Sequence, residues 1–162
     1  MMKLKRIMDM VYLILLGATI GGILAIGIIM TSTIFNSEAY IGPLLSHYQE
    51  GSIMSAGFDK FSYFLGFMGI VIFSYEMFSY KTLQTDKTVI LTTLVALSTI
   101  GLFIGVYMPK ILEMQAQGEE VTKSIAFENL HLGSEIDFKI LLISLIVLMG
   151  RRLYVLLGKK YA

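Results

Sequence analysis

The sequence contains no cysteine and no tryptophan, only two prolines and two histidines, and few charged residues. Without cysteine the chain has no disulfide and no thiolate chemistry, although this does not identify its compartment. The net charge of +1 gives no indication of a nucleic-acid partner, and basic residues are not clustered with aromatic ones. No nucleophile is spaced with a general base, so we expect no enzyme.

What the sequence has in excess is apolar side chains. Hydrophobic residues make up 56% of the chain and charged residues 15%, whereas a soluble domain has about 45–50% and about 25%. The surplus must face something other than water. A length of 162 residues allows one domain, so we predict a single membrane domain over residues 1–162.

Apolar runs of membrane-spanning length occur three times. A spanning helix needs about 20 mostly apolar residues. A fourth run, residues 140–149, reaches this length only if its helix begins upstream or continues through RRLYVLLG. We predict four transmembrane helices at about residues 10–34, 60–80, 88–108 and 130–150, joined on the outer side by residues 36–57 and 109–126.

Lysine and arginine indicate how these spans are oriented. They gather near both ends of the chain and between the second and third spans, whereas acidic residues outnumber them in the two other connections. Both termini should therefore be cytoplasmic. The first run lacks a small-x-small cleavage site, so we expect it to remain as a helix. The basic residues are Lys3, Lys5, Arg6, Lys81, Lys87, Arg151, Arg152, Lys159 and Lys160.

The predicted fold class is all-α, an integral membrane four-helix bundle with up-down-up-down topology. Helical spacing continues outside the spans in SIMSAGFDKFSYFLGF and YMPKILEMQAQ, so the helices should extend on the outer side. Pro109 should kink the third helix because it lacks an amide proton. Gly51 should end a short helix or turn. Asp9 and Glu76 should be solvated at the cytoplasmic ends of their spans.

Small residues are concentrated in the first span, in the stretch GATIGG. Such residues let helix backbones approach closely in lipid. Packing within the chain explains them, and a homodimer face is the alternative. The partners we expect are the bilayer and a second copy or another membrane protein. The candidate packing residues are Gly17, Ala18, Gly21 and Gly22.

The stretch FENLHLGSEIDFK, residues 127–139, places a histidine and several charges directly before the fourth apolar run. On a helix, Glu128, His131 and Glu135 share one stripe, with Ser134 beside it and Asp137 on the opposite side. We predict that Glu128, His131, Ser134 and Glu135 form a polar cluster that is buried around His131. An exposed amphipathic helix start is the alternative, because acids suit a helix N-terminus.

Histidines and methionines fall together in the predicted outer layer. Thioether and imidazole groups suit copper, and two histidines can ligate a haem iron. Methionine also fills gaps between helices, which is the plainer explanation. A di-iron site is not expected, because only one Glu-x-x-His motif is present. The candidate ligands are His47, His131, Met54, Met108 and Met114.

Three stretches, QEGSIMSAGFDKFSYFL, VYMPKILEMQ and FENLHLGS, resemble a bacterial membrane family of unknown function. That family is similar to the transmembrane protein 205 group and, distantly, to copper-resistance D membrane proteins. The resemblance implies a four-helix fold in the bacterial inner membrane but no activity. Asp137 stands where the family often has asparagine. The matching positions are Gly51, Phe58, Tyr107, Pro109, Phe127, Leu130, His131 and Ser134.

Three functions follow from these observations. The first is a structural or accessory membrane component with a buried polar cluster around His131. The second is a transporter, or a transport component, for a metal ion or small solute. The third is a redox subunit that binds haem or copper through His47 and His131.

Overall fold

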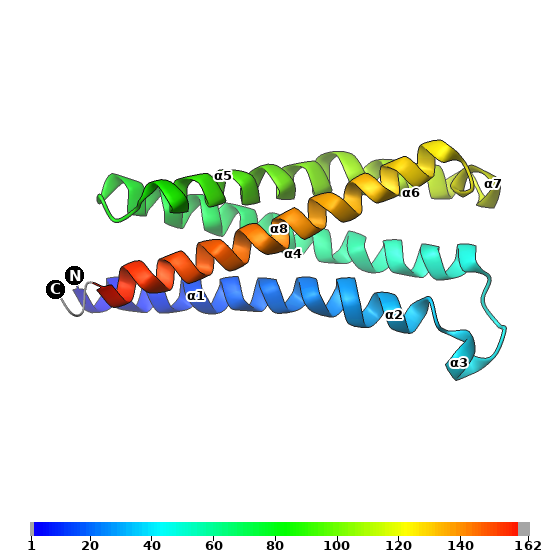
Figure 1. Cartoon of the computed structure of the whole chain (residues 1–162), viewed down its shortest axis with the longest axis horizontal. Helices are drawn as coiled ribbons and strands as arrows, with labels where there is room; N and C mark the ends of the chain where they lie inside the picture. The colour runs from blue at the N-terminus through cyan, green and yellow to red at the C-terminus, as the bar shows by residue number, and fades with distance from the viewer. Residues whose placement is uncertain (1, 159–162) are drawn as a thin grey trace.

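The computed structural model describes residues 2–158, and every regular element in that range is helical. Four long helical segments lie side by side along the longest axis of the molecule (Figure 1). The first, α1 (Met2–Leu24), begins at the same end where the last, α8 (Ile125–Gly158), finishes. Lys159 and Lys160, which support the predicted orientation, lie outside the described residues.

The first segment continues from α1 through a π-helical stretch, η1 (Ala25–Met30), into α2 (Thr31–Ile34). A short helix, α3 (Glu38–Ile41), follows and ends at Gly42. The φ of Gly42 is +70°, in the left-handed region that glycine adopts without steric cost. This glycine therefore ends the helix and lets the chain turn toward the second segment.

The second segment is one helix, α4 (His47–Lys81), of 35 residues. It begins with a capping box, in which the Ser46 and Gln49 side chains each accept a hydrogen bond from the other residue's backbone N–H. Gly51 lies inside this helix, so the prediction that Gly51 ends a helix is wrong. The capping box satisfies the first amides of the helix upstream of that glycine.

The third segment consists of α5 (Lys87–Leu102), the π-helical η2 (Phe103–Tyr107) and α6 (Met108–Ala116). Asp86 caps α5 by accepting a hydrogen bond from the Val89 amide at 3.0 Å. Pro109 stands in the first turn of α6, where its missing amide proton is tolerated. The irregularity in this segment is the π-helical stretch η2, which lies directly before the turn that contains Pro109.

The fourth segment follows the short helix α7 (Glu119–Thr122) and is formed by α8 alone. The stretch FENLHLGSEIDFK forms the early turns of α8, as its helical spacing predicted. The helix then continues through the apolar run and through RRLYVLLG. The upstream and downstream extensions that the fourth predicted span requires are therefore both helical.

Three helices in the described residues are long and apolar enough to cross a membrane. They are Leu4–Ile34, His47–Lys81 and Lys87–Ala116, and each contains one of the first three predicted spans. Large apolar side chains are exposed along the outside of these helices, as Ile14, Ile70 and Leu91 illustrate. These features indicate a membrane protein.

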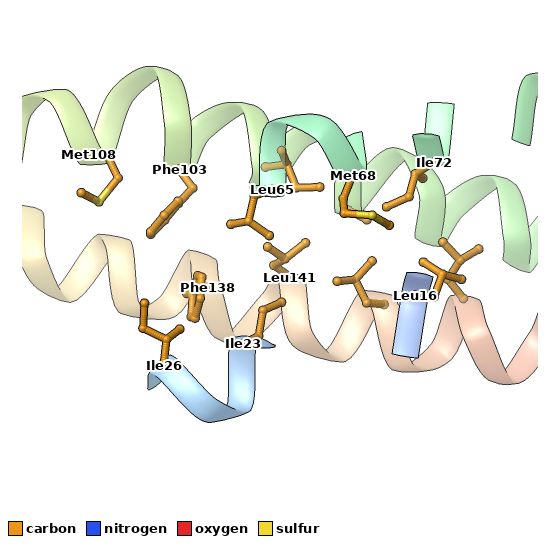
Figure 2. Packing of buried hydrophobic residues seen from close by; sticks show 14 of the residues in the cluster. Leu16, Ile23, Ile26, Leu65, Met68, Ile72, Phe103, Met108, Phe138 and Leu141 are labelled. Atoms are coloured by element: carbon orange, nitrogen blue, oxygen red, sulfur yellow. The ribbon is translucent and has the colours of Figure 1, made fainter. Parts of the chain in front are cut away.

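The hydrophobic core lies between the four long segments (Figure 2). Leucine, isoleucine, methionine and phenylalanine side chains from all four meet there, including Leu16, Met68, Phe103 and Leu141. Phe138 of α8 contacts three aromatic rings, with centroid distances of 5.0 Å to Phe103, 5.3 Å to Phe58 and 6.4 Å to Phe61.

The small residues of α1 are divided between the core and the outside. A Cβ atom at Gly22 would lie 2.8 Å from the Phe61 ring, and one at Gly17 would lie 3.6 Å from Met149. Gly22 is thus needed for close packing within the chain. Ala18 and Gly21 are exposed, and a Cβ atom at Gly21 would meet nothing within 4 Å.

Candidate functional site

Two oppositely charged side chains are buried where α1 begins and α8 ends. Arg152 of α8 is 2% exposed and Glu76 of α4 is 6% exposed. The Arg152 Nε donates to Glu76 Oε1 at 2.8 Å, and Nη2 makes a second contact with Oε2. This two-point pairing is the strongest geometry available to an arginine and a carboxylate.

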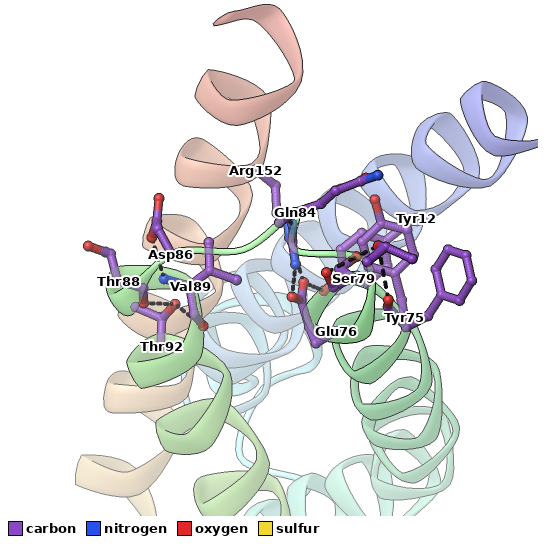
Figure 3. Close-up of polar contacts among 12 residues, drawn as sticks. Tyr12, Tyr75, Glu76, Ser79, Gln84, Asp86, Thr88, Val89, Thr92 and Arg152 are labelled. Atoms are coloured by element: carbon purple, nitrogen blue, oxygen red, sulfur yellow. Dashed lines mark hydrogen bonds and ion pairs between the residues drawn. The ribbon is translucent and has the colours of Figure 1, made fainter. Parts of the chain in front are cut away.

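Tyr12 and Gln84 also belong to this site. We call the four residues Tyr12, Glu76, Gln84 and Arg152 the Arg152 cluster. The Tyr12 hydroxyl donates to Glu76 Oε1 at 2.8 Å, and Arg152 Nη1 donates to the Gln84 carbonyl at 2.7 Å (Figure 3). The cluster therefore connects α1, α4, the loop between α4 and α5, and α8.

Tyr75 forms a second layer beside the cluster. Its ring stacks on Tyr12 with a centroid distance of 3.7 Å, and the Arg152 guanidinium lies 5.4 Å from its centroid. Its hydroxyl donates to Asp9 Oδ1 at 2.7 Å. Stacking and cation–π contact add to the charge pairing. Glu76 is therefore not solvated, which corrects the prediction for this residue.

Helical periodicity explains why Glu76 and Arg152 point inward. Residues three or four apart share a helix face. Glu76 follows Leu65, Met68 and Ile72 on the buried stripe of α4. Arg152 follows Leu141, Leu145 and Leu148 on the buried stripe of α8. This continuation of each stripe is the sequence signal that could have identified the pair.

A more exposed ion pair lies beside the cluster, where Arg151 Nε is 2.7 Å from Asp86 Oδ2. Burial would raise the pKa of Asp86, but the Val89 amide and the Arg151 guanidinium outweigh it and lower the pKa below its ordinary value. Asp86 therefore stays ionised at neutral pH and can cap α5 and hold α8 at once.

The predicted polar cluster at the start of α8 lies mostly on the surface. The His131 side chain is 53% exposed, with Nε2 3.6 Å from Glu135 Oε1. Glu135 also pairs with Lys139 at 3.0 Å, and Glu128 is exposed. Ser134 is buried and donates to the His131 carbonyl at 2.7 Å. The prediction of a cluster buried around His131 within the chain is therefore wrong.

The opposite face of α8 accounts for this correction. Ser134, Asp137, Phe138 and Leu141 follow one another at helical spacing and are all buried. These residues fill the side of α8 that packs against the other segments, so the His131 stripe points outward. The alternative interpretation, an exposed amphipathic helix start, describes this face.

The five candidate metal ligands differ in how far their side chains are exposed. The His47 side chain is 87% exposed, with Nδ1 3.4 Å from Glu50 Oε2, and His131 is also exposed. Met54 and Met108 belong to the hydrophobic core, and Met114 is partly buried. Residues 2–158 contain no group of three or more histidine, aspartate and glutamate side chains that could hold a metal ion. The two imidazoles are therefore exposed, whereas the thioethers of Met54 and Met108 are buried.

A second buried polar group stands at the start of α4. Glu50 is buried and accepts a hydrogen bond from the Ser37 hydroxyl at 2.6 Å. The neighbouring Tyr48 hydroxyl donates to the Gln115 carbonyl at 2.8 Å, which connects α4 to α6. The capping box of Ser46 and Gln49, which fixes the start of α4, is the sequence signal that could have pointed to this arrangement.

Comparison with known families adds one result. A protein-family model described as a domain of unknown function, DUF4149, matches residues 14–120, which is more than half of the chain. Comparisons with curated proteins and with solved structures gave no match. The matched range includes Glu76 but ends before α8, so Arg152 lies outside it.

Proposed function

The chain belongs to the DUF4149 family, a domain of unknown function, and on this premise we propose that it is a structural or accessory component of a membrane. The family supplies no activity, so the argument must come from the arrangement of the chain itself. The three helices that are long and apolar enough to cross a membrane support a place in a bilayer, and the Arg152 cluster supports a structural role for the bundle there.

We propose that all four long segments cross the bilayer as an up-down-up-down bundle, at about residues 10–34, 60–80, 88–108 and 130–150. The 35 residues of α4 correspond to about 52 Å at about 1.5 Å per residue, against a hydrocarbon thickness of about 30 Å. The excess supports helices that extend beyond the outer surface of the bilayer.

We propose the bacterial inner membrane as the location, with both termini cytoplasmic. Lys5, Lys81, Lys87 and Arg151 stand at the end of the bundle where α1 begins, α4 ends, α5 begins and α8 ends. Basic residues near span ends favour the cytoplasmic side. The other end carries Glu38, Glu119 and Glu120 in its connections.

This topology predicts a pattern of chemical labelling. The chain has no cysteine, so each introduced cysteine is the only thiol. In intact cells, a membrane-impermeant maleimide should label Ala39→Cys and Gln117→Cys, whereas Thr82→Cys should react only after permeabilisation. All three positions are exposed in the structure. Labelling of Thr82→Cys in intact cells, with protection of the other two, would reverse the proposed orientation.

The Arg152 cluster is the observation that carries the accessory role. A buried ion pair joined to Tyr12 and Gln84 holds three helices and a loop in one arrangement. Such pairs contribute little net stability compared with apolar packing, but they can select one arrangement of the chain. A transporter needs helices that move against each other, so a cluster that ties them together favours a fixed scaffold.

The exposed small residues of α1 support association with another membrane protein or a second copy. Ala18 and Gly21 lie on the outside of α1, and the space beside Gly21 is open. In lipid, such positions allow a second helix to approach closely. We propose this face as the contact with the partner.

Native mass measurement in lipid nanodiscs tests the accessory role. The wild-type protein should form a complex heavier than one 18.1 kDa chain. Gly21→Leu should dissociate it by filling the α1 face. Gly101→Leu is the matched control, because Gly101 is also exposed with nothing near its Cβ position but lies on α5. A wild-type protein that remains a single chain would contradict the proposal, and solute flux in proteoliposomes would support transport instead.

Transport of a metal ion or small solute is the second candidate function, and Asp137 is the observation that favours it. This acid is buried within the proposed fourth span, where ionisable groups often serve transport. Kinship with the transmembrane protein 205 group or with copper-resistance D proteins remains a prediction. A redox role for His47 and His131 is not favoured, because both imidazoles face outward.

A further inference from the structure

Three of the acids described in the structure are buried: Glu50, Glu76 and Asp137. Glu76 and Asp137 have the same exposure, 6%, but different partners. Glu76 accepts hydrogen bonds from Tyr12 and Arg152, and Glu50 accepts one from Ser37. In contrast, no donor within residues 2–158 reaches Asp137 Oδ2.

Asp137 lies on the face of α8 that packs against the other segments, between Ser134 and Leu141 on the buried stripe. One turn before it, Gly133 contacts Tyr107 of η2. A Cβ atom at Gly133 would be 3.1 Å from the Tyr107 ring and 3.3 Å from its hydroxyl oxygen. Glycine therefore lets the phenol lie against α8. Tyr107 itself lies in the π-helical stretch η2, and such stretches are often found at functional sites.

No charge in the described residues pairs with Asp137. Tyr107 of η2 is a titratable side chain that lies against Gly133, one turn before Asp137 on α8. On α8 itself, Glu135 and Lys139 pair with each other on the exposed side. The other titratable groups on α1, α5, α6 and α7, which pack against α8, are Lys5, Arg6, Asp9, Tyr12, Lys87, Lys110, Glu113, Glu119 and Glu120. The helix α4 also contacts α8, through Phe58, Phe61 and Glu76, and its titratable groups are His47, Tyr48, Glu50, Asp59, Lys60, Tyr63, Tyr75, Glu76, Tyr80 and Lys81.

An ionised carboxylate in these surroundings is expensive in free energy. Water is excluded from Oδ2, and no cation or amide replaces it within the described chain. A buried acid without such compensation becomes neutral by binding a proton. Glu76 is equally buried, but it accepts hydrogen bonds from a guanidinium and a phenol, and the guanidinium supplies the opposite charge. Pairing rather than depth separates the two acids.

We propose that Asp137 is a proton-binding site inside the helix bundle. A hydronium ion from the solvent transfers one proton to a carboxylate oxygen and leaves as a water molecule. The new O–H bond makes Asp137 a neutral carboxylic acid at neutral pH. No other group changes charge in this step. The site goes beyond the accessory role and does not depend on it. It supplies the kind of buried carboxyl group that membrane proteins use to carry protons.

Infrared spectroscopy of the protein in nanodiscs tests this proposal. At neutral pH the wild-type protein should show the carbonyl stretch of a protonated carboxylic acid, although exposed acids ionise near about pH 4. Asp137→Asn should abolish that signal. Glu76→Gln, at the equally buried but paired acid, and Asp59→Asn, at a partly exposed acid, should both retain it.

The wild-type spectrum decides the outcome even if a variant fails to fold. Absence of a protonated carboxyl signal at neutral pH would overturn the proposal, as would its persistence in folded Asp137→Asn. Disappearance of the signal on addition of sodium or potassium would show that Asp137 binds a metal cation instead. The accessory role is tested by the mass of the complex, so a negative infrared result would not contradict it.

Discussion

Arg152→Leu is expected to lower the free energy of unfolding by about 3–5 kcal/mol, because it leaves Glu76 buried without its cation. The Tyr12 hydroxyl would remain as a donor to Glu76, but it carries no charge to balance the carboxylate. Gln84 would lose the bond that its carbonyl accepts from Arg152. Denaturant or thermal unfolding in detergent, followed by circular dichroism, measures the change.

Arg151→Leu is the matched control for Arg152→Leu. Arg151 is the adjacent residue and also pairs with an acid, but its side chain is 38% exposed. Exposed pairs contribute about 0–1 kcal/mol. The double variant Glu76→Leu with Arg152→Leu should recover most of the lost stability, because apolar replacement of a whole buried pair is often neutral or stabilising. Equal effects of Arg151→Leu and Arg152→Leu would contradict the buried pairing.

The double variant also separates stability from arrangement. If it is stable but no longer forms the wild-type complex in nanodiscs, the Arg152 cluster acts by fixing how α1, α4 and α8 sit against each other. If complex formation is unchanged, the apolar core alone determines that arrangement. The proposed scaffold function predicts the first result, because α1 carries both Tyr12 and the proposed contact face around Gly21.

The long helices were predictable because each corresponds to a run of apolar residues or to helical spacing in one continuous stretch of sequence. Apolar runs located the three helices that are long and apolar enough to cross a membrane, and the spacing in FENLHLGSEIDFK correctly placed the start of α8 on a helix. Gly51 does not end a helix, because the capping box of Ser46 and Gln49 starts α4 just before it. A glycine inside a helix costs only about 1 kcal/mol, which the rest of α4 easily offsets.

The polar sites were harder to predict because pairing depends on distance in space. Glu76 and Arg152 are 76 residues apart in the sequence, so no local pattern connects them. Histidine is rare in this sequence, but the face of α8 on which a residue lies, not its rarity, determines whether it is buried. The sequence did place Asp137 opposite the His131 stripe, but only packing against the other segments shows that this side is the buried one.

Phe138→Ala is the second substitution with a large expected effect, about 3–5 kcal/mol of lost stability. The Phe138 ring is buried among Phe58, Phe61 and Phe103, and a Cβ atom at Gly27 would lie 3.5 Å from it. Truncation removes the contacts of all these groups and leaves a cavity that rigid neighbouring helices cannot fill. Unfolding in detergent measures the loss.

Phe67→Ala is the control, because Phe67 is a phenylalanine of the same size on α4 but is exposed. Its side chain faces lipid or detergent, which fills the space left by truncation, so its loss should cost far less than that of Phe138. Phe138→Leu should fall between the two, since leucine refills part of the cavity. Comparable losses at positions 67 and 138 would mean that the aromatic cluster is not the centre of the core. In that case the orientation of α8, and with it the burial of Asp137 and Arg152, would be different.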